Sequence, residues 1–169
     1  DPATDGVLGL VQLDCEGWIG ESMLILGPDG TSVLLDVGND DHAAYVREAV
    51  RVYTGLNSVD AVVLTHFHAD HAGGLDTLGV PYDALVSRGP VHLEAVQLPD
   101  SFEDAPRVDL CTAAGCDLPW TLALGGGAEL TVFAADGEIG GDHFGELPDD
   151  DDGENARSLV GIVRWGTFT

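Results

Sequence analysis

The side chains best suited to chemistry lie in one short run, His66-Phe67-His68-Ala69-Asp70-His71. His66 and His68 are two residues apart, so in extended backbone they point to the same side and can bind one metal ion. Asp70 and His71 follow where small residues and glycines let the chain turn, and they can bind a second ion beside the first. Imidazole and carboxylate form the ligand set that Zn prefers and that Mn or Fe accepts. The run predicts a centre for two divalent metal ions, with Zn expected.

The elements around this run are predicted from the hydrophobic pattern. A short apolar strand over 61–64 leads directly into it, and its unbroken apolar residues indicate that both of its faces are covered. Further strands are expected over 7–13, 22–26, 32–36, 84–87, 128–134 and 158–164, and a helix from Asp40 or Asp41 to about Tyr53, ended by Gly55. Residues 99–119 are expected to form an irregular loop, and 136–155 a mobile acidic loop. Many strands, few helices and a motif at a strand end predict one layered α/β domain over 1–169.

The charge balance limits the classes of molecule that the chain is expected to bind. The chain has 30 acidic residues against 6 basic ones, all of them Arg, and a net charge of -24. This disfavours a broad nucleic-acid surface, although a local metal site can still bind a phosphate. No apolar run reaches the roughly 18 residues of a membrane helix. The sequence begins with Asp1 rather than Met, which indicates a removed signal segment or a fragment, and a secreted, periplasmic or cell-surface location is expected.

The cysteines leave one alternative open. Cys111 and Cys116 lie in a short, turn-prone loop that an exported protein could close with a disulfide. Spacing alone does not decide between a disulfide and two free thiols.

Two motifs carry a family resemblance. Residues 65–75 resemble the His-x-His-x-Asp-His signature of the metallo-β-lactamase superfamily, and 34–38 resemble its upstream aspartate motif. The segments 11–14, 20–25 and 154–160 are similar to one branch, the hydrolase domain of bacterial DNA-uptake competence proteins and their secreted relatives. The resemblance implies an αββα sandwich with two metal ions at one edge.

The resemblance also implies roles for the site residues. His66 and His68 would hold the first ion, Asp70 and His71 the second, and Asp36 would lie behind them and orient a ligand. A metal-bound hydroxide would attack an ester, amide or phosphodiester, and Asp70 would also orient this nucleophile as a catalytic residue.

The third ligand of the first ion has rival candidates. His143 lies in a glycine-rich loop, whereas the Asn-x-x-Ser segment of the competence-like branch places Asn155 and Ser158 there. Asn is a poor zinc ligand but a good hydrogen-bonding partner for substrate. His42 and His92 are expected to be surface or packing residues. The run Asp149 to Asp152 with Glu154 lacks the spacing of a calcium loop and is expected to be solvated.

The resemblance further implies residues beyond Thr169. A bridging Asp and a final His would follow the strand over 158–164, so the chain is expected to match roughly the first two-thirds of a domain, with its C-terminal part missing. Weak or absent activity is expected unless a second segment supplies the missing parts. Association is expected through an exposed sheet edge or with that C-terminal segment. The leading hypothesis is a hydrolase of phosphodiesters, including nucleic acid. A lactone, β-lactam or thioester hydrolase and a non-catalytic metal-binding or structural module are the alternatives.

Overall fold

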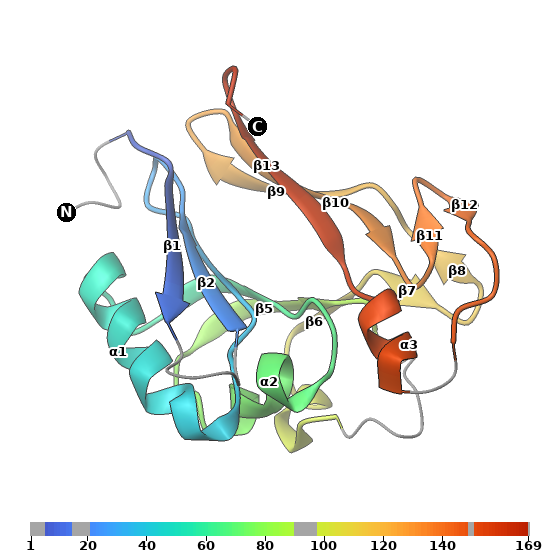
Figure 1. Ribbon diagram of the computed structural model, residues 1–169. Helices are drawn as coiled ribbons and strands as arrows, with labels where there is room; N and C mark the ends of the chain where they lie inside the picture. Colours follow the sequence, from blue (N-terminus) through green and yellow to red (C-terminus); the bar gives the residue numbers. More distant parts are fainter. Residues whose placement is uncertain (1–5, 15–20, 90–97, 149–150, 169) are drawn as a thin grey trace.

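The computed structural model describes residues 6–14, 21–89, 98–148 and 151–168 (Figure 1). Two sheets face each other, and helices α1 (Ala43–Thr54) and α2 (Ala69–Ala72) lie on the outer side of the first sheet. The first sheet has the order β1-β2-β3-β4-β5-β6. Its strands are β1 Gly9–Asp14, β2 Glu21–Leu26, β3 Ser32–Leu35, β4 Val59–Val63, β5 Tyr82–Ser87 and β6 Arg107–Asp109. The prediction of a layered α/β architecture is confirmed.

The second sheet is antiparallel and centred on β10. β10 pairs with β9 on one side and with β13 on the other, and the β11–β12 hairpin extends from its end. Its strands are β9 Trp120–Gly125, β10 Ala128–Ala135, β11 Glu138–Ile139, β12 Asp142–His143 and β13 Val160–Trp165. In the part of the chain that the structure describes, β13 pairs with β10 alone along its length. Association through this edge stays a prediction.

The apolar strands of the first sheet serve two cores at once. Leu24, Leu34 and Val62 pack toward α1, where they meet Val46 and Val50. Their chain neighbours Ile25, Val33 and Val63 point to the other face and pack against the second sheet. Because successive side chains of a strand alternate between faces, a sheet covered on both sides needs unbroken apolar strands.

The helix prediction is confirmed in the main. A short 3₁₀ turn, Asp40–His42, precedes α1, which ends at Thr54 with Gly55 in the left-handed conformation at φ 72°. Glycine suits that position because it has no Cβ to clash there.

The two predicted loops were wrong in part. Residues 99–119 contain the 3₁₀ turn Asp100–Phe102, strand β6 and the hairpin of β7 (Cys111–Thr112) and β8 (Gly115–Cys116), which a disulfide between Cys111 and Cys116 closes. Residues 136–155 contain β11, β12 and most of helix α3 (Asp151–Ala156). These elements have two to six residues, too few to show a hydrophobic period, and their partners are distant in sequence.

The parallel strands define the functional edge. β4 runs parallel to both β3 and β5, so the carboxyl ends of these strands lie together. Asp36 follows β3, the histidine run follows β4, and Arg88 follows β5. Ligand sites in sheets of this kind form outside the carboxyl ends of the strands. No helix in the described ranges is long and apolar enough to cross a membrane.

Candidate metal centre

His66 and His68 lie on one side of the chain as it leaves β4. The residue between them, Phe67, points the other way and is 1% exposed in the core. His66 Nε2 lies 3.1 Å from His68 Nδ1, and the rings meet edge-on with centroids 4.9 Å apart. Two nitrogen ligands on one tetrahedral Zn²⁺ are about 3.3 Å apart, given Zn–N bonds of about 2.0 Å. The pair therefore fits a single divalent ion.

His71 is oriented from behind by Asp36. His71 Nδ1 lies 2.8 Å from Asp36 Oδ2, and the same carboxylate accepts hydrogen bonds from the Thr65 amide and the Thr65 hydroxyl, each 2.7 Å long. The main chain reinforces this arrangement because the Val37 amide donates to the His71 carbonyl at 2.8 Å. With Nδ1 engaged, Nε2 of His71 is the nitrogen available to an ion.

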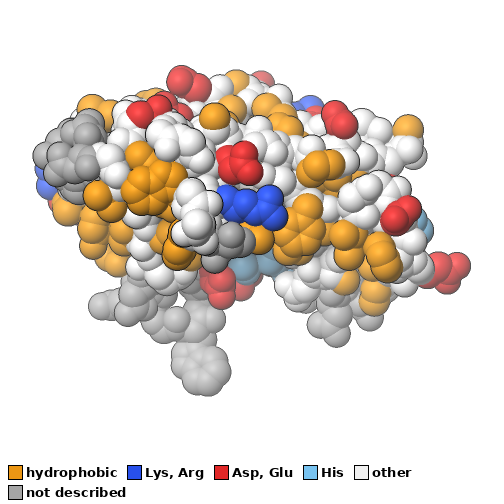
Figure 2. Space-filling model, turned by 90° about the horizontal axis from the view of Figure 1, so that it is seen from above, with side chains coloured by type: hydrophobic (Ala, Val, Ile, Leu, Met, Phe, Trp, Pro, Cys, Tyr) orange, Lys and Arg blue, Asp and Glu red, His pale blue; other side chains and the backbone are white. Residues whose placement is uncertain are grey.

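Asp70 lies beside that nitrogen. Its Oδ2 is 3.7 Å from His71 Nε2, and its side chain is 41% exposed at the start of α2. The His66 and His71 rings are 3.9 Å apart between centroids, so the two candidate pairs are adjacent. In Figure 2 histidine side chains are recessed between acidic and hydrophobic ones.

The protonation of this cluster follows from its burial. Burial, helped by the nearby His71 and His68, lowers the pKa of His66 to about 4, so the ring is neutral and able to bind a metal at neutral pH. Burial also acts to lower the pKa of His71, but the hydrogen bond and charge of Asp36 outweigh it and the pKa is raised. Burial raises the pKa of the Asp36 carboxyl despite its hydrogen bonds with His71 and Thr65.

The cluster supplies its ligands as two pairs. Among the described residues, no three His, Cys, Asp or Glu side chains are placed to hold one ion. The fit to metal rests on the His66–His68 separation and on the Asp36 contact that leaves His71 Nε2 facing Asp70.

Residues 16–154 match the family model of the metallo-β-lactamase superfamily. The chain belongs to this superfamily. Hydroxyacylglutathione hydrolase from Xanthomonas campestris pv. campestris is 31% identical over 115 residues, which cover 68% of this chain and 42% of that protein. Transcription termination factor FttA from Methanothermobacter thermautotrophicus is 40% identical over 83 residues, 46% of this chain and 12% of that protein. The chain thus spans less than half the length of either relative.

A solved structure supports the fold. The flavodiiron protein from Giardia intestinalis superposes with a TM-score of 0.55 at 15% sequence identity, covering 85% of this chain and 30% of that one. The αββα metallo-β-lactamase sandwich predicted from the sequence is the fold of this chain. Members of this superfamily typically bind divalent metal ions, and the identity of the metal here stays a prediction.

The structure does not bring His143 to the histidine cluster. His143 pairs with Glu138 in the β11–β12 hairpin and is exposed, and it lines a separate hollow with Asp136, Glu146, Leu147 and Arg157. Of the other histidines, His42 is half-buried before α1, and His92 lies outside the described residues.

Asn155 and Ser158 form a turn at the end of α3. The Asn155 side chain is exposed, and its carbonyl accepts hydrogen bonds from the Ser158 hydroxyl at 2.8 Å and amide at 3.2 Å. The next amide, that of Leu159, donates to the Thr65 carbonyl at 2.8 Å. This segment therefore joins the second sheet to the start of the histidine run through its main chain.

Glu154 was misassigned to a solvated acidic run. Its side chain is 0% exposed, and its Oε2 accepts a 2.6 Å hydrogen bond from Nη2 of Arg88, which is equally buried. Its Oε1 accepts a hydrogen bond from the Phe67 amide at 2.9 Å. The sequence held one clue, since an Arg directly after the apolar strand β5 needs a buried anion as partner.

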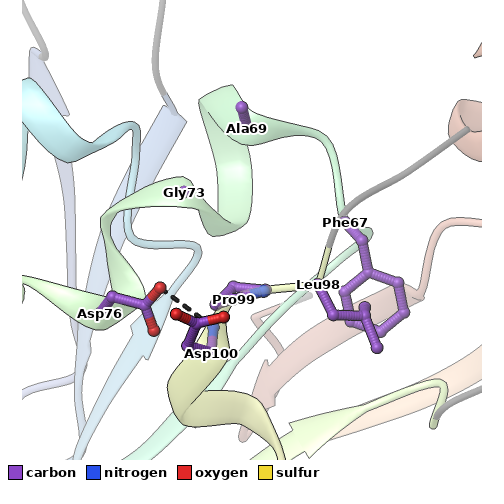
Figure 3. Close-up of a pocket in the computed structure, with 7 residues that line it drawn as sticks. All are labelled: Phe67, Ala69, Gly73, Asp76, Leu98, Pro99 and Asp100. Atoms are coloured by element: carbon purple, nitrogen blue, oxygen red, sulfur yellow. Dashed lines mark hydrogen bonds between the residues drawn. The ribbon is translucent and has the colours of Figure 1, made fainter.

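A hollow of about 230 Å³ lies next to the run, between α2, the turn after it and residues 98–100 (Figure 3). Phe67, Ala69 and Gly73 line it together with Asp76, Leu98, Pro99 and Asp100. Both Asp76 oxygens accept backbone hydrogen bonds, from the Asp100 amide at 3.0 Å and the Ser101 amide at 2.7 Å. None of the candidate ligands lines this hollow, so it is separate from the metal centre.

Proposed function

We propose that this chain binds two divalent metal ions and acts as a metal-dependent hydrolase. The observation that carries the proposal is the 3.1 Å separation of His66 Nε2 and His68 Nδ1, which suits one ion. Asp70 and His71 would hold the second ion, and Zn²⁺ is the metal we expect from this donor set.

Three residues of the chain have distinct roles in the proposed hydrolysis. Bound divalent ions supply a water of lowered pKa and stabilise the charge that develops on the attacked group. The partly exposed Asp70 would accept a hydrogen bond from the nucleophilic water and orient it. Asp36 holds His71 in one orientation, and His66, being neutral, offers Nε2 without competition from a proton.

The substrate we propose is a short phosphodiester. The likeness of residues 154–160 to the competence-type branch supports this class. The net charge of -24 opposes the approach of a long polyanion, which favours a short substrate over extended nucleic acid. A thioester is the second candidate, supported by the 31% identity to hydroxyacylglutathione hydrolase.

A metal titration with a substrate panel tests the proposal. Zn²⁺, Mn²⁺ and Fe²⁺ are added to the metal-free chain, bound metal is counted by mass spectrometry, and hydrolysis of bis(p-nitrophenyl) phosphate, a glutathione thioester and a chromogenic cephalosporin is followed. We expect two bound ions and weak phosphodiester turnover. Turnover of the thioester alone would favour the second candidate, and binding without any turnover would favour a non-catalytic metal-binding module.

Two histidine variants make the test specific. His66→Ala removes a proposed ligand, whereas His143→Ala removes an exposed histidine that lines a different hollow. We expect loss of bound metal in the first variant and the parent stoichiometry in the second. Loss of metal in His143→Ala would contradict the ligand assignment.

We also propose that the chain works outside the reducing cytoplasm. The Cys111–Cys116 disulfide supports this location because such bonds persist in oxidising compartments. Thiol alkylation of the protein taken from its native cells, followed by intact mass measurement, tests it. Alkylation of both cysteines without prior reduction would contradict the proposal.

A further inference from the structure

A buried ion pair lies directly beneath the histidine run. Glu154 belongs to α3 and Arg88 follows β5, and both side chains are 0% exposed. Removing two charges from water is costly, and the attraction between them offsets that cost only when hydrogen bonds satisfy the remaining polar atoms. The contacts that this pair makes with the histidine run therefore indicate its structural role.

Glu154 contacts the run at its centre. Oε1 accepts the hydrogen bond of the Phe67 amide at 2.9 Å, and Oε2 is held by Arg88 at 2.6 Å. That amide belongs to the peptide unit between His66 and Phe67, in the middle of the segment that carries both candidate ligands of the first ion. Fixing the plane of one peptide restricts the dihedral angles on either side of it, and with them the directions of the neighbouring side chains.

Arg88 fixes the same residue through its ring. The Arg88 guanidinium carbon lies 4.9 Å from the centroid of the Phe67 ring, which packs edge-on against Phe102 at 5.3 Å. Cations are attracted to aromatic faces at such distances. Phe67 is thus held at its main chain by the carboxylate and at its ring by the guanidinium.

A second ion pair, Arg157–Asp136, lies between the end of α3 and the turn after β10. Arg157 Nη1 donates to Asp136 Oδ1 at 2.7 Å, a length close to that of the Arg88–Glu154 bond. Its two side chains are 15% and 19% exposed. The pair offers a matched control for the loss of an ion pair as such.

We propose that Glu154, oriented by Arg88, is a positioning residue for the metal centre. Its carboxylate sets the approach of His66 Nε2 to His68 Nδ1 through the Phe67 amide. The inference rests on the proposed metal-binding function for its consequence, a higher affinity for the first ion.

Variants of the Arg88–Glu154 pair distinguish the effect of losing the hydrogen-bond acceptor from the effect of losing the charges. Arg88→Met with Glu154→Leu removes both charges and the acceptor, whereas Arg88→Met with Glu154→Gln removes the charges and keeps an oxygen for the Phe67 amide. Glu154→Asp keeps the negative charge near Arg88 but shortens the side chain by one methylene, which moves the acceptor oxygen away from the Phe67 amide. This variant replaces the Leu variant in the test if the Leu variant does not fold. Asp136→Asn is the control, because Asn tolerates the left-handed conformation of this residue at φ 48°.

Two readouts are recorded on the whole chain. The first is the set of imidazole ¹⁵N resonances in the metal-free protein, at a pH well above the ordinary histidine pKa. The second is the Zn²⁺ affinity, by competition with a chromogenic chelator. We expect the Leu variant and Glu154→Asp to shift the His66 and His68 signals, to leave those of His71 in place, and to lose about ten- to a hundredfold in Zn²⁺ affinity. The Gln variant should change less than the Leu variant in both readouts, because it keeps an acceptor for the Phe67 amide, and Asp136→Asn should match the parent.

Two results would overturn the proposal. One is parent-like signals in both the Leu variant and Glu154→Asp. The other is a Gln variant that changes as much as the Leu variant, since the charges and not the acceptor would then matter. If the parent chain binds no zinc, the proposed function fails, and the metal-free resonances decide the positioning role by themselves.

Discussion

Asp36 Oδ2 lies 2.8 Å from His71 Nδ1, although 35 residues separate the two along the chain. The contact joins the end of β3 to the short helix α2 that follows β4. It leaves Nε2 as the free nitrogen of His71 and aims it at Asp70. The aspartate thereby determines which atom of the histidine a metal ion would meet.

Replacing Asp36 by Asn tests this relationship. An amide has one acceptor oxygen and one NH₂ group, so it would face at least one of the donors from Thr65 or His71 with a donor of its own. We expect Asp36→Asn to lower Zn²⁺ affinity by about ten- to a hundredfold, measured by chelator competition.

Asp60→Asn provides the matched control. Asp60 Oδ2 alone accepts both hydrogen bonds from Ser32, at 2.7 Å from its amide and 3.0 Å from its hydroxyl, so the oxygen of Asn can replace it. The control should bind Zn²⁺ as the parent does. An Asp36→Asn protein with the affinity of this control would show that Asp36 does not orient a ligand.

The pKa of His66 predicts acid sensitivity of the metal-free protein. The folded ring has a pKa of about 4 against an ordinary value of 6.5, so between these values the unfolded chain binds a proton that the folded chain does not. Stability is therefore lost as pH falls from 6.5 to about 4, by up to about 3 kcal/mol in total. Urea unfolding of the chelator-treated chain across this range measures the loss.

His66→Asn isolates that contribution, because His71 and Asp36 also titrate differently in the folded protein. The stability of the parent relative to this variant should decline steadily through the same pH window. A difference that stays constant from pH 6.5 to pH 4 would contradict the buried, neutral state of His66.

Gly74 lies in the 3₁₀ turn Gly73–Asp76, directly after α2, where this turn passes close to the loop after β3. A Cβ at this position would be 2.7 Å from the Val37 carbonyl oxygen and 3.0 Å from that of Asn39, and backbone cannot move aside cheaply. We expect Gly74→Ala to lower the free energy of unfolding by about 1 to 3 kcal/mol. Urea unfolding of the metal-free protein measures it.

The adjacent glycine is the control for this substitution. A Cβ at Gly73 would meet the Ala69 Cβ at 3.5 Å and the Asn39 Cα at 3.6 Å, which are ordinary contacts. Gly73→Ala should leave stability unchanged or raise it by up to about 1 kcal/mol. Equal effects of the two substitutions would argue against a close approach at Gly74.

Strong periodic or motif signals made part of this structure predictable. The apolar strand β4 and the ligand types after it are encoded locally, so the positions of His66 and His68 follow from the sequence near them. The partner of Glu154 could not be read in the same way. It depends on a contact 66 residues away that only the assembled sheets create, and an acidic neighbourhood in the sequence suggested solvent instead.

The rival third ligands show the same limit. His143 and the Asn155 segment were both plausible by distance along the chain, but the turn at Asp136 and the β11–β12 hairpin carry His143 to another hollow. The direction of a two-residue strand depends on its turns, which periodicity does not report.

The Cys111–Cys116 disulfide should add stability by closing a short loop. For so few residues, chain-entropy arguments give about 2 kcal/mol. We expect reduction to lower the free energy of unfolding by about this amount. The double variant Cys111→Ser with Cys116→Ser should match the reduced protein and show no further response to reductant. A reductant effect in the double variant would assign the change to another group.

Phe67 gives this metal-binding signature a hidden requirement. Signatures of this kind write the residue between two histidines as freely variable, yet here that side chain is 1% exposed, lies against Arg88 and Phe102, and carries the amide that Glu154 binds. In a library randomised at position 67 and selected for folded protein, the residues recovered at this position should be large and apolar. The variable position of the motif would then anchor the segment in the core, and this anchoring would fix where the two flanking histidines lie.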